Sequence, residues 1–224
     1  MAARSVLRAE NLGKEVNSPE GPLTILAGVD LDVQAGDTVA VAGPSGAGKS
    51  TLLALLAGLD EPTTGTVWLN GAEFSTLDED GRARVRAQQV GFVFQSFHLV
   101  PSLTALENVM LPLELAGRRD ARETAHQVLA KVGLAERERH YPRQLSGGEQ
   151  QRVAIARAFV THPAVLFADE PTGNLDTATG ARIINLLFDL NQDSGTTLIL
   201  VTHDAAIASR CRHRVQLEAG RVVR

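Results

Sequence analysis

The 224-residue sequence has one cysteine, Cys211, so no disulfide bond can form within the chain. A lone cysteine is typical of proteins that work in a reducing compartment. We expect Cys211 to be a packing residue near the end of the chain.

Long apolar runs are also missing. TLLALLAGLD (51–60) is among the longest and is too short to cross a bilayer. The first fifteen residues, MAARSVLRAENLGKE, lack the apolar stretch of a secretory signal. If the protein acts at a membrane, we expect another protein to hold it there.

The chain has no basic excess, since its formal net charge is -4. Two basic clusters, GRARVRAQQ from 81 and GRRDAR from 117, are interleaved with apolar or acidic residues, as in solvated helix faces. We therefore expect no nucleic-acid partner. What the sequence does contain is 44% hydrophobic residues, enough for the core of one large domain, with or without an insertion.

Three apolar, β-rich segments each end in polar residues. DTVAVA (37–42) leads into a glycine-rich loop, AVLFADEP (164–171) ends in two acids, and TTLILVTHD (196–204) ends in His-Asp. Short apolar strands followed by helical segments predict a parallel sheet covered on both faces. Ligands of such sheets bind beyond the carboxyl ends of the strands, where these polar residues lie.

Other segments predict additions to this core. Alternation in LTILAGVDLDV (23–33) and the Asn70-Gly71 pair predict a small antiparallel β layer. VQLEAGRVV (215–223) predicts a hairpin. Residues 75–89 look helical, with Thr76 and Glu79 at capping-box spacing.

The pattern of residues 95–159 is mostly helical. We interpret it as a helical subdomain inserted into an α/β core made of residues 1–94 and 160–224.

GPSGAGKST (43–51) fits the P-loop pattern. Its glycines let backbone amides approach phosphate oxygens without Cβ clashes. Lys49 is placed to reach the β- and γ-phosphates, and the Ser50 hydroxyl to bind Mg²⁺. A chance glycine-rich turn is the alternative, but the loop lies between a predicted strand and a predicted helix. The expected phosphate-binding residues are Gly43, Pro44, Ser45, Gly46, Ala47, Gly48, Lys49, Ser50 and Thr51.

Polar residues at the ends of three other β-rich segments are candidates for the chemistry. Asp169 is expected to bind Mg²⁺, and Glu170 to polarise an attacking water. His203 would donate a hydrogen bond to the γ-phosphate or to that water. Gln95 would contact ATP, Mg²⁺ and water, and so link the nucleotide to the helical subdomain. Each could also be an ordinary capping or polar residue at a strand end, but the nearby P-loop favours the functional interpretation.

LSGGEQQR (145–152) predicts a second anion site. Its Ser-Gly-Gly precedes an apparent helix, and exposed amides at a helix start bind anions. One nucleotide needs only one phosphate cradle, so the second requires an explanation.

These motifs together resemble the ATP-binding cassette (ABC) ATPases over essentially the whole chain. GPSGAGKST, Gln95, LSGGEQQR, FADEP, NLD (174–176) and His203 occur in the order of that family. QSFHLVPSLTALENVMLPLELAG and DEPTGNLD resemble its lipoprotein-releasing, macrolide-export and cell-division members, and among these the YbbA-like ATPases. The resemblance implies a P-loop NTPase with a RecA-like core, an N-terminal antiparallel β layer and an inserted helical subdomain, using ATP and Mg²⁺.

The resemblance also implies a homodimer in which two chains pack head to tail. The signature of one chain, represented here by Ser146, Gly147, Gly148 and Gln150, then closes the P-loop site of the other. Asp176 would couple the two chains. Because ATP carries charge on both sides of its γ-phosphate, a second helix start can cover the side that the P-loop leaves open. ATP would then hold the subunits together, and hydrolysis would weaken the joint.

A transport role follows from the same resemblance. The chain would dock on the cytoplasmic face of the inner membrane, against an integral-membrane permease with a periplasmic domain that handles lipid-like or hydrophobic cargo. A groove around residues 95–113 would receive a short helix of that permease. Phe97, Leu99 and Leu103 are candidates for the groove, although core packing explains each of them equally well.

The sequence departs from the family pattern at the residue that contacts adenine. Many ABC ATPases have an aromatic residue that stacks on the base where this chain has Val16. Stacking contributes roughly 1 kcal/mol, so the preference for ATP over GTP is left open.

Three other functions are consistent with parts of the sequence. A soluble ABC ATPase acting on DNA or ribosomes usually has coiled-coil insertions or two cassettes, whereas this chain has one P-loop and one signature. A P-loop kinase would not need LSGGEQQR. A nonhydrolysing regulatory subunit is disfavoured by Glu170 and His203.

Overall fold

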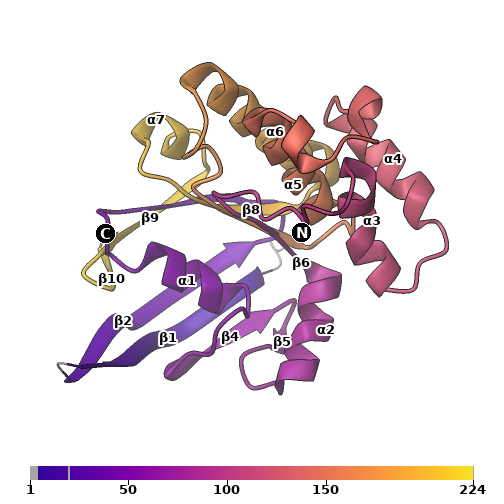
Figure 1. The fold of residues 1–224 in the computed structure, drawn as a ribbon. Coiled ribbons are helices and arrows are strands. Elements are labelled where there is room, and N and C mark those ends of the chain that lie inside the picture. Colours follow the sequence, from indigo (N-terminus) through magenta and orange to yellow (C-terminus); the bar gives the residue numbers. More distant parts are fainter. Residues whose placement is uncertain (1–4, 20, 224) are drawn as a thin grey trace.

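The computed structural model describes residues 5–19 and 21–223 and contains two β-sheets (Figure 1). The smaller sheet has the order β2-β1-β4-β5 and is antiparallel throughout. Its strands are β1 (Ser5–Ser18), β2 (Gly21–Gln34), β4 (Thr64–Leu69) and β5 (Ala72–Glu73). The predicted antiparallel layer is confirmed.

The larger sheet has the order β10-β9-β3-β8-β7-β6, and all its neighbours are parallel except β9 and β10. Its strands are β3 (Thr38–Ala42), β6 (Val90–Val93), β7 (Val165–Asp169), β8 (Thr197–Val201), β9 (His213–Glu218) and β10 (Arg221–Val223). Every side chain of β3 and β8 is buried. The parallel sheet covered on both faces is therefore confirmed.

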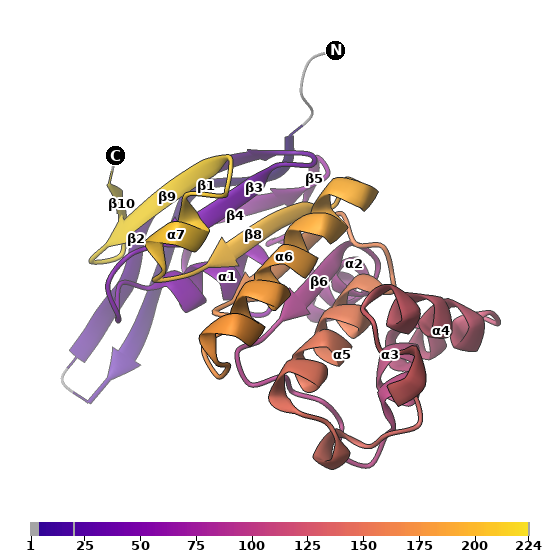
Figure 2. The same ribbon diagram turned by 90° about the horizontal axis from the view of Figure 1, so that it is seen from above.

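Helices cover the larger sheet on both faces. Helix α1 (Lys49–Leu56) lies between the two sheets in Figure 1, and its leucines share one apolar core with both. A second core on the opposite face joins α5 (Gly147–Phe159) and α6 (Thr177–Ser194) to α3 (Ala105–Leu115) and α4 (Ala121–Lys131). Figure 2 shows α3 and α4 grouped beside α5, away from the small sheet. The predicted division at residues 94/95 and 159/160 stays a prediction.

The two predicted turns are present. Asn70 and Gly71 both have positive φ, at 51° and 80°, as a two-residue hairpin turn of the I′ type requires. The C-terminal hairpin pairs Arg221 with Glu218. In the part of the chain that the structure describes, no helix is long and apolar enough to span a bilayer.

The predicted capping box at Thr76 and Glu79 is wrong. Helix α2 (Glu79–Gln89) begins two residues later than that box requires, and its N-cap is Asp78, whose side chain accepts a hydrogen bond from Gly81 N at 2.8 Å. Aspartate is a better N-cap than threonine. The oxygen of an N-cap side chain accepts a hydrogen bond from a free backbone N–H in the first turn of the helix, as Asp78 does from Gly81.

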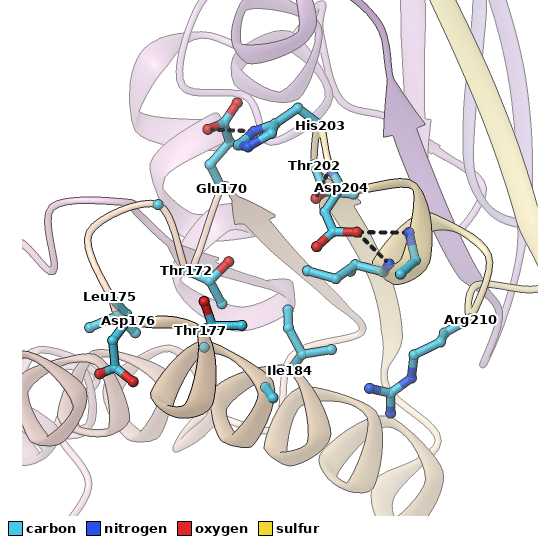
Figure 3. A pocket seen from close by; sticks show the side chains of 15 residues that line it. Glu170, Thr172, Leu175, Asp176, Thr177, Ile184, Thr202, His203, Asp204 and Arg210 are labelled. Carbon is cyan, nitrogen blue, oxygen red and sulfur yellow. Dashed lines mark hydrogen bonds and ion pairs between the residues drawn. The ribbon is translucent and has the colours of Figure 1, made fainter.

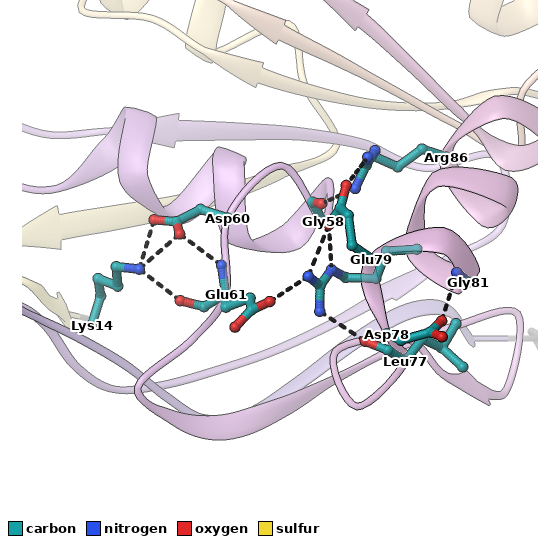
Figure 4. A network of polar contacts seen from close by, with 10 residues as sticks. Lys14, Gly58, Asp60, Glu61, Leu77, Asp78, Glu79, Gly81 and Arg86 are labelled. Atoms are coloured by element: carbon teal, nitrogen blue, oxygen red, sulfur yellow. Dashed lines mark hydrogen bonds and ion pairs between the residues drawn. The ribbon is translucent and has the colours of Figure 1, made fainter.

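The Glu79 carboxylate instead forms ion pairs within a polar network. It pairs with Arg82 at 2.8 Å and Arg86 at 2.6 Å, and Arg82 also pairs with Glu61. Figure 4 shows how Lys14 of β1 extends this network through Asp60 at 2.7 Å. The network connects the start of α2 to the segment after α1, which contains Asp60 and Glu61, and to strand β1. Two short helical turns, Ala135–Arg137 and Pro142–Gln144, and helix α7 (Ala205–Ala208) complete the fold.

Candidate active site

The P-loop runs from the end of β3 to the start of α1. Gly48 has φ 96°, and a Cβ there would lie 3.0 Å from the Ile25 carbonyl oxygen. At Gly43 a Cβ would lie 2.1 Å from the Leu217 carbonyl oxygen. The loop can therefore take this path only with glycine at these two positions.

Lys49 lies inside the loop and is only 8% exposed. Its Nζ donates hydrogen bonds to the carbonyl oxygens of Gly43 and Pro44, both at 2.9 Å. The ammonium group is thus held at the centre of the loop, on the side that faces a cavity of about 640 Å³. The residues lining this cavity are Ile25, Gly43, Pro44, Ser45, Gly46, Gly48, Lys49, Ser50, Thr51, Glu170 and His203.

Two expected ATP-binding residues are not in that lining. Ala47 points into the core and is 3% exposed, so it can contribute only backbone. Gln95 follows β6, and its Nε2 lies where a Cβ on Gly173 would approach within 2.6 Å. The backbone oxygen of Gln95 accepts a hydrogen bond from Asn174 at 3.1 Å. The structure therefore places Gln95 against the loop that follows β7.

Asp169 ends β7 beside Ser50 and Lys49. Burial raises the pKa of Asp169 above its ordinary value and the Glu170 charge adds to this, whereas the Ser50 hydrogen bond and the Lys49 charge oppose it. A hydroxyl and a carboxylate side by side are oxygen donors of the kind Mg²⁺ prefers. Among the described residues no group of three or more His, Cys, Asp or Glu side chains could hold a metal. Ser50 and Asp169 thus fit an ion that takes most of its ligands from phosphate and water.

Glu170 and His203 meet at the ends of β7 and β8. His203 Nδ1 lies 3.3 Å from Glu170 Oε2, and Figure 3 shows the two side chains facing each other. Glu170 has φ 43°, a left-handed conformation that is uncommon for a residue other than glycine. Both residues line the P-loop cavity and also a neighbouring cavity of about 490 Å³ between α6 and α7. The carboxylate is therefore open to solvent beside the loop that would hold a γ-phosphate.

The signature begins helix α5. Ser146 is its N-cap, and Ser146 with Glu149 forms a capping box: Glu149 N donates to Ser146 Oγ at 3.3 Å, and Ser146 N donates to Glu149 Oε2 at 2.8 Å. Ser146, Gly147 and Gly148 line a polar cavity of about 350 Å³. Gln150 does not line it, and its Nε2 donates to the Leu145 carbonyl oxygen at 3.0 Å.

Asp176 joins the signature cavity from α6, where its side chain caps the helix by accepting from Thr179 N at 3.0 Å. The signature cavity and the P-loop cavity share no lining residue. The two anion sites of one chain are therefore separate places on the molecule.

Comparison with known proteins decides the family. Residues 26–173 match the family model described as ABC transporter. The chain belongs to the ABC transporter family. It is therefore an ABC ATPase, the nucleotide-binding subunit of a transporter.

Relatives of this ABC ATPase align over nearly their full length. It is 54% identical to the ABC transporter ATP-binding protein YbbA of Escherichia coli (strain K12), over 99% of this chain and 98% of that protein. It is 49% identical to the lipoprotein-releasing system ATP-binding protein LolD of Legionella pneumophila (strain Paris), over 96% of both. The subgroup resemblance seen in the sequence is confirmed.

Solved ABC cassettes have the same fold. A dimeric structure of the ATP-binding cassette MJ0796 bound to ADP and Pi matches with a TM-score of 0.90 at 40% identity, over 97% of both chains. CbiO1 from Clostridium perfringens, part of the transporter complex cbiONQ, matches with a TM-score of 0.86 at 28% identity, over 99% of this chain and 88% of that one. The predicted fold class is confirmed.

Several site residues were missed by reasoning from sequence. Ile25 lines the P-loop cavity from β2, and Arg152 and Arg182 line the signature cavity. Arg152 immediately follows the signature glutamines, and this position could have singled it out. Ile25 and Arg182 come from segments that carry no motif, so only the folded chain brings them to the site.

Proposed function

We propose that this ABC ATPase works as a homodimer with two composite sites, each made from the P-loop of one chain and the signature of the other. The observation that carries this proposal is the separation of the two cavities. A signature that shares no lining residue with the P-loop of its own chain is free to face the P-loop of a second chain. The dimeric structure of the MJ0796 cassette, bound to ADP and Pi, supports the proposal that such cassettes pair.

Within each site the residues take distinct roles. Lys49 and the loop amides bind the β- and γ-phosphates of ATP, and Ser50 and Asp169 hold Mg²⁺, which neutralises charge on those phosphates. Glu170 accepts a proton from the attacking water, a contribution commonly worth about 10²–10⁴-fold in rate. His203, at 3.3 Å, orients that carboxylate and faces the same cavity. Gln95, on the loop against Gly173, contacts the water from the other side.

The partner chain completes the site. The amides of Gly147 and Gly148 donate to its γ-phosphate, because a helix start carries unpaired N–H groups and a positive partial charge. Ser146 shapes this helix start through its capping box with Glu149, which takes up the Ser146 amide. Gln150 stands beside this loop, and Asp176 couples the two chains. Hydrolysis and phosphate release remove the charge that both halves bind, so the dimer opens.

We further propose that the dimer docks at the cytoplasmic face of the inner membrane on a permease with a periplasmic domain, and drives the movement of lipid-like or hydrophobic cargo. The similarity to a lipoprotein-releasing ATP-binding protein supports this proposal. We assign the docking surface to residues 95–113, where Phe97, Leu99 and Leu103 are all partly buried.

Mixing two inactive variants tests the composite site. Lys49→Ala removes the cation of the P-loop. Gly147→Asp places bulk and negative charge in the signature, and a Cβ at Gly147 meets only the side chains of Leu175 and Phe97, at 3.3 and 3.7 Å. Each variant alone should be nearly inactive, because every site of its homodimer has one damaged half.

The mixture should regain ATPase activity and ATP-dependent association. It contains a heterodimer in which the intact P-loop of the Gly147→Asp chain meets the intact signature of the Lys49→Ala chain. Normal ATP hydrolysis by Gly147→Asp alone would rule out a role of the signature in the partner's site.

A further inference from the structure

The two loops that carry Gln95 and Glu170 contain backbone strain. Phe97, His98 and Glu170 have positive φ values of 57°, 49° and 43°, although none is glycine. Such residues cost energy and persist only where the surrounding structure holds them in place. The groups that hold these loops are therefore part of what places the catalytic carboxylate.

One buried side chain bonds both loops. Gln151 lies on α5 and is 0% exposed. Its Nε2 donates to the carbonyl oxygen of Pro171, the residue after Glu170, at 2.8 Å, and to that of Phe94, the residue before Gln95, at 3.4 Å. Its Oε1 is buried without a donor among the described residues. The amide is thus used for its N–H groups.

Helix α5 does not need these two bonds for its own placement. The capping box of Ser146 and Glu149 fixes its start, and Val153, Ile155 and Phe159 are buried along its length. The loops are the parts that need support. Glu170 is otherwise held by two backbone bonds, from its N–H to Val201 at 3.1 Å and from Gly173 N to its carbonyl at 3.0 Å.

We infer that Gln151 is a positioning residue that fixes Glu170 for catalysis in its own chain, although it belongs to the helix whose first residues serve the partner's ATP. The inference rests on the composite site proposed above. Because Pro171 is bonded directly to Glu170, a shift of this carbonyl moves the carboxylate relative to the attacking water. Misplacement by about 1 Å costs on the order of 100-fold in rate.

The mixture of Lys49→Ala and Gly147→Asp chains distinguishes an effect of Gln151 on Glu170 of its own chain from an effect on the signature at the start of α5. Its single working site takes Glu170 from the Gly147→Asp chain and the signature from the Lys49→Ala chain. Gln151→Met keeps the size of the side chain and removes both donors. Placed on the Gly147→Asp chain, it should lower turnover by on the order of 10- to 100-fold. Placed on the Lys49→Ala chain, it should leave turnover close to that of the unchanged mixture.

ATP affinity gives a second readout. In the otherwise unchanged protein, Gln151→Met should lower kcat and leave equilibrium ATP binding as it was, because Lys49 and the P-loop amides are untouched. Asn191→Leu is the matched control. Asn191 Nδ2 also donates to two backbone carbonyls, those of Gly36 and Thr196, but on α6 away from the site. This control should act equally from either chain.

Equal loss of turnover from both chains would overturn the inference. General destabilisation by Gln151→Met would act from either chain, and a displaced signature would act from the Lys49→Ala chain, whereas a misplaced Glu170 acts only from the Gly147→Asp chain. Full turnover with Gln151→Met on the Gly147→Asp chain would also overturn it. If the mixture without Gln151 changes shows no turnover, the composite site itself fails, and with it the role of Gln151 in that site.

Discussion

Three aliphatic side chains extend from the P-loop cavity along the β1–β2 hairpin. Ile25 lines the cavity, Leu23 lies two residues before it on β2, and Val16 pairs directly opposite Leu23. Val16 and Leu23 are 39% and 51% exposed. A nucleotide whose phosphates occupy the loop can lay its base on this aliphatic strip, which offers contact area but no hydrogen-bonding side chain.

Base recognition should accordingly be weak. The protein should bind ATP and GTP with similar affinity in equilibrium competition. Val16→Tyr should then tighten ATP binding modestly through stacking worth roughly 1 kcal/mol, or about fivefold. Val16→Leu, which adds area without a π face, is the control. Strong ATP selectivity in the unmodified protein would mean that another side chain recognises adenine.

The residues found from sequence are those whose role depends on local chain geometry. Lys49 and Ser50 lie at the cavity because a P-loop joins a strand to a helix within a few residues. Ser146 starts α5 because its capping box with Glu149 is local too. Gln151 could not be found this way, since its proposed role depends on hydrogen bonds to carbonyl oxygens of two loops that are distant in the sequence.

At the scale of elements, helix starts are decided by which residue satisfies the first free amides. Asp78 does so for α2, through Gly81 N. Spacing alone favoured Thr76 with Glu79, but it could not reveal that Arg82 and Arg86 bind the Glu79 carboxylate. Strand order was equally hidden, because the sequence carries no record that β3 lies between β8 and β9.

The two possible caps of α2 can be told apart by unfolding. Asp78→Ala should lower the free energy of unfolding by about 1 kcal/mol. Thr76→Ala, an exposed residue outside the helix, should change it by less than about 0.5 kcal/mol. Urea denaturation of both variants measures this difference. A larger loss from Thr76→Ala than from Asp78→Ala would restore the original assignment.

At the scale of the whole molecule, ATP acts as a reversible link between subunits. Glu170→Gln keeps the size of the side chain and loses the basic oxygen, so binding should persist while hydrolysis slows by about 10²–10⁴-fold. An ATP-held dimer should then accumulate on gel filtration. Ligand bound only by the folded form stabilises it by about 2.7 kcal/mol at 100 times its Kd, so ATP should also raise the unfolding temperature.

Adding Lys49→Ala to Glu170→Gln supplies the control, because the double variant should stay monomeric and gain no thermal stability from ATP. Hydrolysis at the normal rate by Glu170→Gln would show that Glu170 is not the base.

The close approach of Gly43 to the Leu217 carbonyl oxygen bears on when the P-loop can fold during synthesis. The P-loop is bounded by strand β9, which pairs with β3, and Gly220 N donates to the Ala47 carbonyl at 3.2 Å. Ribosomes deliver the chain from its N-terminus, so the motif at 43–51 emerges long before the hairpin that encloses it. A growing chain therefore carries the phosphate-binding sequence without its finished shape, and we expect nucleotide capture only after residues 213–223 have emerged and paired.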